Sequence, residues 1–191
     1  MNDGKMKYVY HGSHIKGLKK IFKKSGTHQK KWVYGALSKS IALIFISNKG
    51  SDLYYHLSGN GTKENPIVLV ERKENMFKEI FDMSGSLYTL NAKNFVSGKT
   101  GWSAEVVSEF DEPVLNEEQI DNVLKEIIQL ASKKELVLYF YPDRPKNIPL
   151  DNSDLIPKVI KWKKRGVNID KFFALYPELK DKFFKQLENE N

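Results

Sequence analysis

The sequence predicts an α+β fold in which most strands precede most helices, and three observations support this prediction. Short runs rich in β-branched and aromatic residues, bounded by turn-forming residues, recur between residues 8 and 115. From residue 116 onward, apolar residues recur mainly at helical spacing. No glycine-rich dinucleotide fingerprint follows a predicted strand, which disfavours a doubly wound parallel sheet. We therefore expect a core over 1–115 and a mainly helical C-terminal extension over 116–191, packed together as one globular unit.

The first strand is predicted at residues 8–10, and it runs directly into His11, Gly12 and Ser13. Glycine lets another group approach the backbone closely, because it has no Cβ atom. Histidine donates or accepts a hydrogen bond near neutral pH. A strand that ends in this way suits the recognition of a flat, polar ligand.

Local spacing predicts the elements that follow. Apolar residues over 15–22 match a short helical face, and residues 32–34 form a β-rich run. Ser38 can cap a helix that carries Ile41, Ala42 and Phe45 on one face, although β-branched residues there would also suit a strand.

The later elements are predicted from apolar runs and capping residues. Asn116 is an N-cap candidate followed by an acidic first turn, which predicts a helix over 116–131. The segments 53–57 and 76–81 are ambiguous. Further strands are predicted at 67–71, 85–90, 102–108, 114–115 and 135–141, and further helices at 154–165 and 170–188.

The charge of the chain is concentrated near its N-terminus. The 191 residues carry a net charge of +7, and residues 1–31 contain nine lysines but only one acidic residue, Asp3. This excess can attract a nucleotide or nucleic acid, although a solubilising face has the same composition. Arginine occurs only three times, which argues against arginine-fork reading of bases or phosphates.

Composition also excludes several classes of protein. The chain has no cysteine, so disulfides, thiolate metal sites and cysteine nucleophiles are excluded. No run approaches the roughly 18 apolar residues of a membrane helix, and residues 1–7 lack the apolar core of a signal peptide. We expect a cytoplasmic protein with no membrane partner, although a toxin secreted by another route would look the same.

No motif for metal-dependent or nucleophilic catalysis stands out. His11 and His14 lie three residues apart but have no nearby acidic partner, so no metal site is predicted. The Gly-x-Ser-x-Gly elbow and the phosphate-binding P-loop are both absent from the sequence. Spacing alone does not identify a Ser-His-Asp arrangement.

Three motifs in a fixed order resemble the ADP-ribosyltransferase superfamily. They are Tyr10-His11-Gly12-Ser13, the run Val33-Tyr34-Gly35-Ala36-Leu37-Ser38-Lys39-Ser40-Ile41-Ala42-Leu43-Ile44-Phe45, and Trp102-Ser103-Ala104-Glu105-Val106-Val107. The resemblance is to the His-Tyr-Glu branch, which includes poly(ADP-ribose) polymerases (PARP) and diphtheria toxin. It implies a split β-sheet core and nicotinamide adenine dinucleotide (NAD) as substrate, with no metal.

The resemblance also implies a role for each matching polar position. His11 would hydrogen-bond the adenosine-side ribose, and Gly12 would bind the nicotinamide amide through its backbone, where a Cβ atom would crowd the ligand. Ser13 belongs to the same NAD-binding motif. Glu105 would bind the nicotinamide ribose and stabilise the oxocarbenium-like transition state, so Glu105 and His11 are the expected catalytic residues.

The aromatic positions match the family less completely. Tyr34 would pack on one face of the nicotinamide ring and Phe45 on the other, where tyrosine is the commoner residue. Ala42 is a predicted NAD-binding residue at a position where the family often has a small hydroxyl residue that bonds the amide. These two departures favour an alternative function, a catalytically inactive ligand-binding or interaction module of the same fold.

Each candidate residue also has a structural interpretation. Tyr34 and Phe45 can be core residues, Glu105 can face solvent, and Glu71 is a rival carboxylate at the end of an apolar strand. The remaining polar and aromatic clusters are expected to be packing residues (Trp32, Trp102), a solvated acidic turn (Glu109, Asp111, Glu112) and a solvated helix end (161–165), the last in preference to a nucleic-acid contact.

The leading prediction is therefore an NAD-dependent ADP-ribosyltransferase that cleaves the nicotinamide glycosidic bond. The resemblance leaves the acceptor of ADP-ribose open between protein, nucleic acid, small molecule and water. A further alternative is an RNA 2′-phosphotransferase-like enzyme of the same superfamily, although the scarcity of arginine argues against it. Acceptor choice lies in loops, and the sequence does not identify it.

Overall fold

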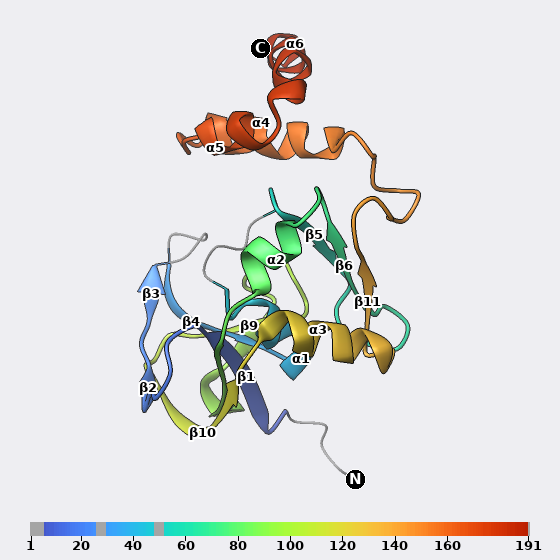
Figure 1. Cartoon of the computed structure of the whole chain (residues 1–191). Coiled ribbons are helices and arrows are strands. Elements are labelled where there is room, and N and C mark those ends of the chain that lie inside the picture. The colour runs from blue at the N-terminus through green and yellow to red at the C-terminus, as the bar shows by residue number, and fades with distance from the viewer. Residues whose placement is uncertain (1–5, 26–29, 48–51, 191) are drawn as a thin grey trace.

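The computed structural model describes residues 6–25, 30–47 and 52–190, which form two β-sheets and the helices α1–α6 (Figure 1). Strands and helices occur in comparable amounts, and the larger sheet is open rather than closed into a barrel. The predicted α+β class is confirmed. Within the described ranges, no helix is long and apolar enough to cross a membrane.

The larger sheet contains most of the predicted site residues. Its strand order is β2-β10-β7-β1-β4-β9-β8, and β3 pairs with β4 outside this path. The strands β1 and β4 lie in the interior of the sheet and are antiparallel to each other. The bounds are Tyr8–Ser13 for β1, Lys20–Ile21 for β2, Lys24–Ser25 for β3, Lys31–Ala36 for β4, Gly85–Asn91 for β7, Val96–Ser97 for β8, Glu105–Ser108 for β9 and Glu112–Ile120 for β10.

The smaller sheet has β6 (Ile67–Glu71) at its centre, with β5 (Tyr55–Ser58) antiparallel on one side and β11 (Leu136–Tyr139) parallel on the other. Short 3-10 turns lie at Ala92–Asn94, Ser153–Leu155 and Pro177–Leu179. The helices are α1 (Lys39–Ile44), α2 (Met76–Phe81), α3 (Val123–Ser132), α4 (Ile156–Lys164), α5 (Asp170–Leu175) and α6 (Lys180–Asn189).

The main hydrophobic core joins the two sheets and the helices into one unit. It contains fully buried side chains from α1 (Ile41), β6 (Leu69), α2 (Phe77), α3 (Ile127) and α5 (Phe172). Burial of such large apolar side chains is the main favourable contribution to folding. Because the C-terminal helices share this core, they are part of the same packed structure as the sheets.

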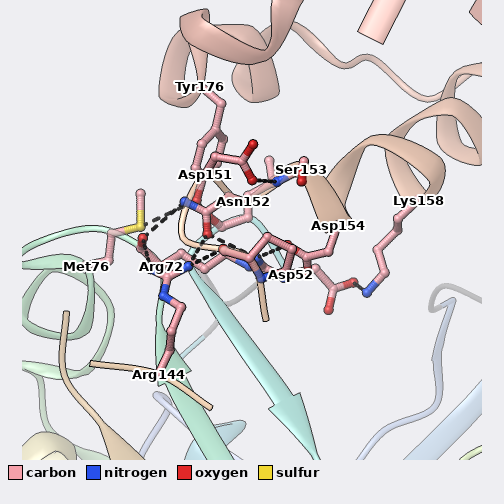
Figure 2. A network of polar contacts seen from close by, with 12 residues as sticks. Asp52, Arg72, Met76, Arg144, Asp151, Asn152, Ser153, Asp154, Lys158 and Tyr176 are labelled. Atoms are coloured by element: carbon pink, nitrogen blue, oxygen red, sulfur yellow. Dashed lines mark hydrogen bonds and ion pairs between the residues drawn. The ribbon is translucent and has the colours of Figure 1, made fainter. Parts of the chain in front are cut away.

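The helices α4, α5 and α6 lie at one end of the molecule, beyond the ends of β5 and β6 (Figure 1). A buried polar network joins this end to the smaller sheet (Figure 2). Arg72, which follows β6 and is 1% exposed, donates from both terminal nitrogens to the Asp154 carboxylate at 3.0 and 2.9 Å. The Asn152 side-chain oxygen accepts from Arg72 at 3.2 Å and from Arg144 at 3.1 Å. We call these four residues the Arg72 clamp.

Most of the predicted strands are present, but two predicted helices are wrong. Residues 15–22 contain a turn, with Gly17 at a φ of 75°, followed by β2; the left-handed glycine does not continue a helix. Residues 116–119 belong to β10, which pairs with β7. The helix begins only at Val123, where the Asn122 side chain accepts a hydrogen bond from the Lys125 amide at 2.9 Å.

Two boundaries also differ from the prediction. The division expected between residues 115 and 116 falls inside β10, because that strand is held by its neighbour β7 rather than by local propensity. The helix expected over 170–188 is divided into α5 and α6 at Pro177. Proline lacks an amide proton and disfavours helical geometry in the residue before it, and Tyr176 accordingly has φ −132° and ψ 60°.

Candidate functional site

A cavity of about 310 Å³ lies between β1, β4, β9 and α1. Every predicted site residue except Ser13 lines it. These residues come from three parts of the sequence, namely β1, the adjacent elements β4 and α1, and β9, and the fold brings the three parts together. The complete lining is Tyr10, His11, Gly12, Tyr34, Gly35, Ala36, Ile41, Ala42, Phe45 and Glu105.

Sheet register brings Glu105 to the first strand. Tyr10 of β1 lies opposite Ala36 of β4, and Ala36 in turn lies opposite Glu105 of β9. The Glu105 amide donates to the Trp102 carbonyl at 3.1 Å, which fixes the turn that leads into β9. The Glu105 carboxylate is therefore carried by the strand next to β4, at the wall of the cavity.

The strand β1 continues through His11 and Gly12 and ends at Ser13, so it is longer than the strand predicted over 8–10. The strand β1 pairs with β7 on one side, where His11 lies opposite Tyr88, and with β4 on the other. A residue between two paired strands has little backbone freedom, so the position of the imidazole is well defined.

Gly12 is required by the packing of α1 on β1. A Cβ atom at this position would lie 1.9 Å from the Ala42 carbonyl oxygen and 2.9 Å from the Ile46 nitrogen. Both are backbone atoms and cannot move aside as a side chain would. The glycine thus allows α1 to lie directly against β1, which is a different reason from the ligand crowding that the family resemblance suggested.

The protonation state of His11 follows from its contacts. Its Nδ1 lies 2.8 Å from the Tyr34 carbonyl oxygen, which only accepts hydrogen bonds, so Nδ1 carries the proton and Nε2 is left as an acceptor in the neutral ring. Burial lowers the pKa of His11; the bond to Tyr34 opposes this effect, and the charge of Lys24 adds to it. His11 is therefore neutral near pH 7.

Two aromatic side chains of the cavity are each backed by a tryptophan. Phe45, the C-cap of α1, meets Trp102 edge-on with ring centroids 6.0 Å apart. Tyr34 meets Trp32 in the same manner at 6.1 Å. Phe45 is 42% exposed, so the interpretation of this ring as a core residue is wrong. Trp102 packs against the main hydrophobic core, as predicted, whereas Trp32 lines a second cavity.

Rival carboxylates have structural partners. Glu71 is buried away from the cavity and accepts hydrogen bonds from the amides of Phe77 at 2.8 Å and Tyr141 at 3.0 Å. Glu112 is also buried, and it accepts from the Ser108 hydroxyl, so the predicted acidic turn is not fully solvated. Among the residues that the structure describes, Glu105 is the one acidic residue that lines the cavity between β1, β4 and α1.

A second cavity of about 250 Å³ adjoins the first and shares His11 and Tyr34 with it. Ser13 lines this second cavity, where its hydroxyl accepts from the Ile15 amide at 3.1 Å. The other polar and aromatic residues here are Lys20, Phe22, Lys24 and Trp32. The basic N-terminal segment was expected to lie near His11 and to meet a pyrophosphate, and two of its lysines, Lys20 and Lys24, line the same cavity as His11.

Other residue clusters offer less chemistry. Over the parts of the chain that the structure describes, no group of three or more histidines and carboxylates could hold a metal ion. The arginines of the Arg72 clamp are near each other, but their terminal nitrogens donate to Asp154, Asn152 and backbone carbonyls. The clamp is therefore interpreted as structural.

The two adjoining cavities can together accommodate an elongated ligand with a flat ring at one end. One cavity offers two aromatic rings and a carboxylate, and the other offers lysines, with a neutral histidine between them. Comparisons with protein-family models, curated protein sequences and solved structures gave no match to this chain.

Proposed function

We propose that this protein is an NAD-dependent ADP-ribosyltransferase with the fold of that superfamily. The observation that carries the proposal is the convergence of His11, Gly12, Tyr34, Ala42, Phe45 and Glu105 on one cavity. These residues are the ones that the family resemblance names in three separate motifs. The interpretation of the motifs as unrelated structural residues does not account for this arrangement.

The first cavity suits the nicotinamide end of the dinucleotide. Tyr34 and Phe45 would contact the ring, and offset or edge-on contacts between flat rings are favourable. The Gly12 backbone would bind the carboxamide. Ala42 has no hydroxyl for a second hydrogen bond to that amide, so the Gly12 backbone alone would orient the carboxamide.

The second cavity suits the remainder of the dinucleotide. The Nε2 atom of His11 can accept a hydrogen bond from a ribose hydroxyl, since the Nδ1 proton is committed to the Tyr34 carbonyl. Lys24, whose charge already acts on His11, would meet the pyrophosphate. The binding groups along the two cavities would then have the same order as the groups of NAD that they contact, from the nicotinamide ring to the pyrophosphate.

The reaction would break the bond between the nicotinamide nitrogen and the ribose carbon C1′. The bonding electron pair leaves with nicotinamide, which becomes neutral, and positive charge develops on the ribose ring. The Glu105 carboxylate would stabilise this charge more strongly than it stabilises the ground state, which is what accelerates a reaction. An acceptor atom then donates a lone pair to C1′ and loses its proton.

The decisive experiment measures nicotinamide release from NAD by the wild type, Glu105→Gln and the control Glu109→Gln. Glu109 is exposed and lies four residues further on. We expect Glu105→Gln to lower the rate by at least about 100-fold, because a charge-stabilising group in a preorganised site contributes that much. Release at the wild-type rate by Glu105→Gln would contradict the assignment of this residue.

The alternative function, an inactive binding module, is favoured by Ala42 and Phe45, the two departures from the family pattern. Titration calorimetry with NAD distinguishes the two proposals. Binding of NAD without release of nicotinamide by the wild type would favour the module. Absence of both binding and release would exclude the enzyme and favour a module whose partner is not NAD.

A further inference from the structure

Two phenylalanines are exposed among lysines next to the second cavity. Phe22 is 59% exposed and Phe110 is 61% exposed, and both are among the most exposed large apolar side chains of the described residues. Lys19, Lys20 and Lys23 are exposed beside them. We call these five residues the lysine–phenylalanine surface.

Backbone pairing holds the two segments of this surface together. Ile21 of β2 lies opposite Glu112 of β10, and the buried Ile21 side chain anchors the pair to the smaller hydrophobic cluster. The Lys23 amide also donates to the Asp111 carboxylate at 2.9 Å. The turn that carries Phe110 is thereby fixed beside the segment that carries Phe22.

The lysines of this surface keep their charge available. Within the described part of the chain, the ion pairs involve other residues and not Lys19, Lys20 or Lys23. The ammonium group of Lys20 lies 5.9 Å from the centre of the Phe22 ring, so charge and ring occur together. Carboxylates are also nearby. Asp111 accepts the Lys23 amide, Glu112 is buried opposite Ile21, and Lys19 contributes to the lowered pKa of Glu117.

Exposed rings next to cations fit a partner that has flat apolar faces and regular negative charge. Single-stranded nucleic acid has both, because its bases stack on aromatic side chains while its phosphates meet lysines. A duplex buries the base faces, so it could use only the charge. The absence of arginine from the surface fits recognition without sequence preference, since reading of base edges relies on arginine forks.

We infer that the lysine–phenylalanine surface binds single-stranded nucleic acid, with bases stacked on Phe22 and Phe110 and phosphates at Lys19, Lys20 and Lys23. The inference does not depend on the proposed reaction, because binding is measured without NAD. Phe22 also lines the second cavity, so a bound strand would lie at the edge of the candidate site.

The test is fluorescence anisotropy of the full chain with labelled oligo(dT) and oligo(U) of about 16 nucleotides, and with a duplex of the same length. We expect the single strands to bind more tightly than the duplex. The tighter of oligo(dT) and oligo(U) identifies the natural polymer. Phe22→Ala combined with Phe110→Ala should weaken binding by at least about fivefold, because each stacked ring contributes a measurable share of the affinity.

Matched controls separate stacking and charge from general damage. Phe184→Ala removes an exposed phenylalanine of α6, at the other end of the molecule, and should leave binding unchanged (Figure 1). Replacing Lys19, Lys20 and Lys23 by Gln should lower the slope of log affinity against log salt by about two, measured between about 50 and 200 mM salt. The same replacement at Lys125 of α3 and at Lys133, its C-cap, should not alter the slope.

Three results would overturn the inference. They are no binding of either single strand at low salt, equal binding of single strand and duplex, and unchanged affinity of the double phenylalanine variant. Binding to phosphatidylserine vesicles through the same residues, without binding to the oligonucleotides, would assign the surface to membrane lipid instead. Thermal unfolding of each variant shows whether the fold is intact.

Discussion

Asp154→Asn removes the only carboxylate that the buried Arg72 side chain contacts in the Arg72 clamp (Figure 2). The substitution keeps the shape of the side chain and removes its charge. Arg72 is fully buried, whereas the Asp154 side chain is 28% exposed, so the ion pair lies at the boundary between core and solvent. We expect a marked loss of stability, because Arg72 would remain buried with no compensating charge.

The magnitude follows from the contacts that remain. Removing one partner of a buried ion pair costs about 3–5 kcal/mol, and partial exposure of Asp154 reduces this to about 2–3 kcal/mol. Arg72 would still donate to the Asn152 oxygen. Nε of Arg72 and Nε of Arg144 have no hydrogen-bond partner among the described residues. The network therefore offers few other hydrogen bonds to replace those that Asp154 accepts. For a chain of this size the loss corresponds to a Tm lower by about 4–12 °C.

Thermal and denaturant unfolding of the wild type and Asp154→Asn measure this difference. The matched control is Glu190→Gln, which removes the carboxylate of an exposed ion pair with Lys164 whose side chains are 38% and 45% exposed. That change should leave the unfolding midpoint almost unchanged, because an ion pair between exposed side chains contributes little to stability. Equal effects of the two substitutions would refute the reasoning, because they would show that burial of Arg72 does not govern the contribution of its partner.

Three further predictions concern the cavity. Gly12→Ala should destabilise the fold by about 1–3 kcal/mol in denaturant unfolding, because the new Cβ would overlap the Ala42 carbonyl; an unchanged midpoint would contradict the packing of α1 on β1. Burial lowers the pKa of His11, so the unfolded chain binds the proton more readily: stability is fully present above about pH 6.5 and declines below it by up to about 1.4 kcal/mol per pH unit. His11→Gln should make this decline in stability shallower. Some decline should remain, because burial also lowers the pKa of His56. An unaltered pH profile of stability would contradict the burial of the His11 ring. Trp102→Ala removes the ring behind Phe45 and the bond to the Gly59 carbonyl, and should weaken NAD binding about two- to tenfold by calorimetry, with Trp102→Phe less affected; equal affinity of all three proteins would exclude a positioning role.

The sequence predicted those parts of the fold that local chemistry determines. The helix α1 was expected from Ser38, and the Ser38 hydroxyl accepts from the Ile41 amide at 3.3 Å as a cap should. The strand β6 was expected from an unbroken apolar run, and it is the central strand of the smaller sheet. In both cases the signal and its physical partner lie within a few residues of each other.

The errors arose where distant partners override local preference. Residues 116–119 have the composition of a helix start, yet they belong to β10, because they pair with β7 in continuous register after an irregularity between Val114 and Asn116. The Glu117 carboxylate, expected in an acidic first turn, instead accepts from the Gly17 amide at 2.8 Å and the Ser86 hydroxyl at 2.6 Å. No local pattern contains this information.

In the candidate site, too, some features were predictable from the sequence and others depend on contacts between distant segments. Motif order identified the cavity residues, but not that Lys24 acts on His11 or that Trp102 supports Phe45. The close approach of Ala42 to Gly12 depends on where α1 lies against β1, which follows from the whole core. Such contacts join segments that are separated along the chain, so they become visible only in the folded structure.

The alignment of Tyr10, Ala36 and Glu105 across three strands has a consequence for how this protein can change. Successive side chains of a strand point to opposite faces, so a slip of one residue in β9 would turn the carboxylate away from the cavity. The neighbours Ala104 and Val106 are both buried, so a glutamate moved to either position would enter the core. An insertion in the exposed loop at Gly98 and Gly101 would leave the position of Glu105 in β9 unchanged. A single insertion within β9 would instead turn the Glu105 carboxylate out of the cavity, although the amino-acid composition would hardly change.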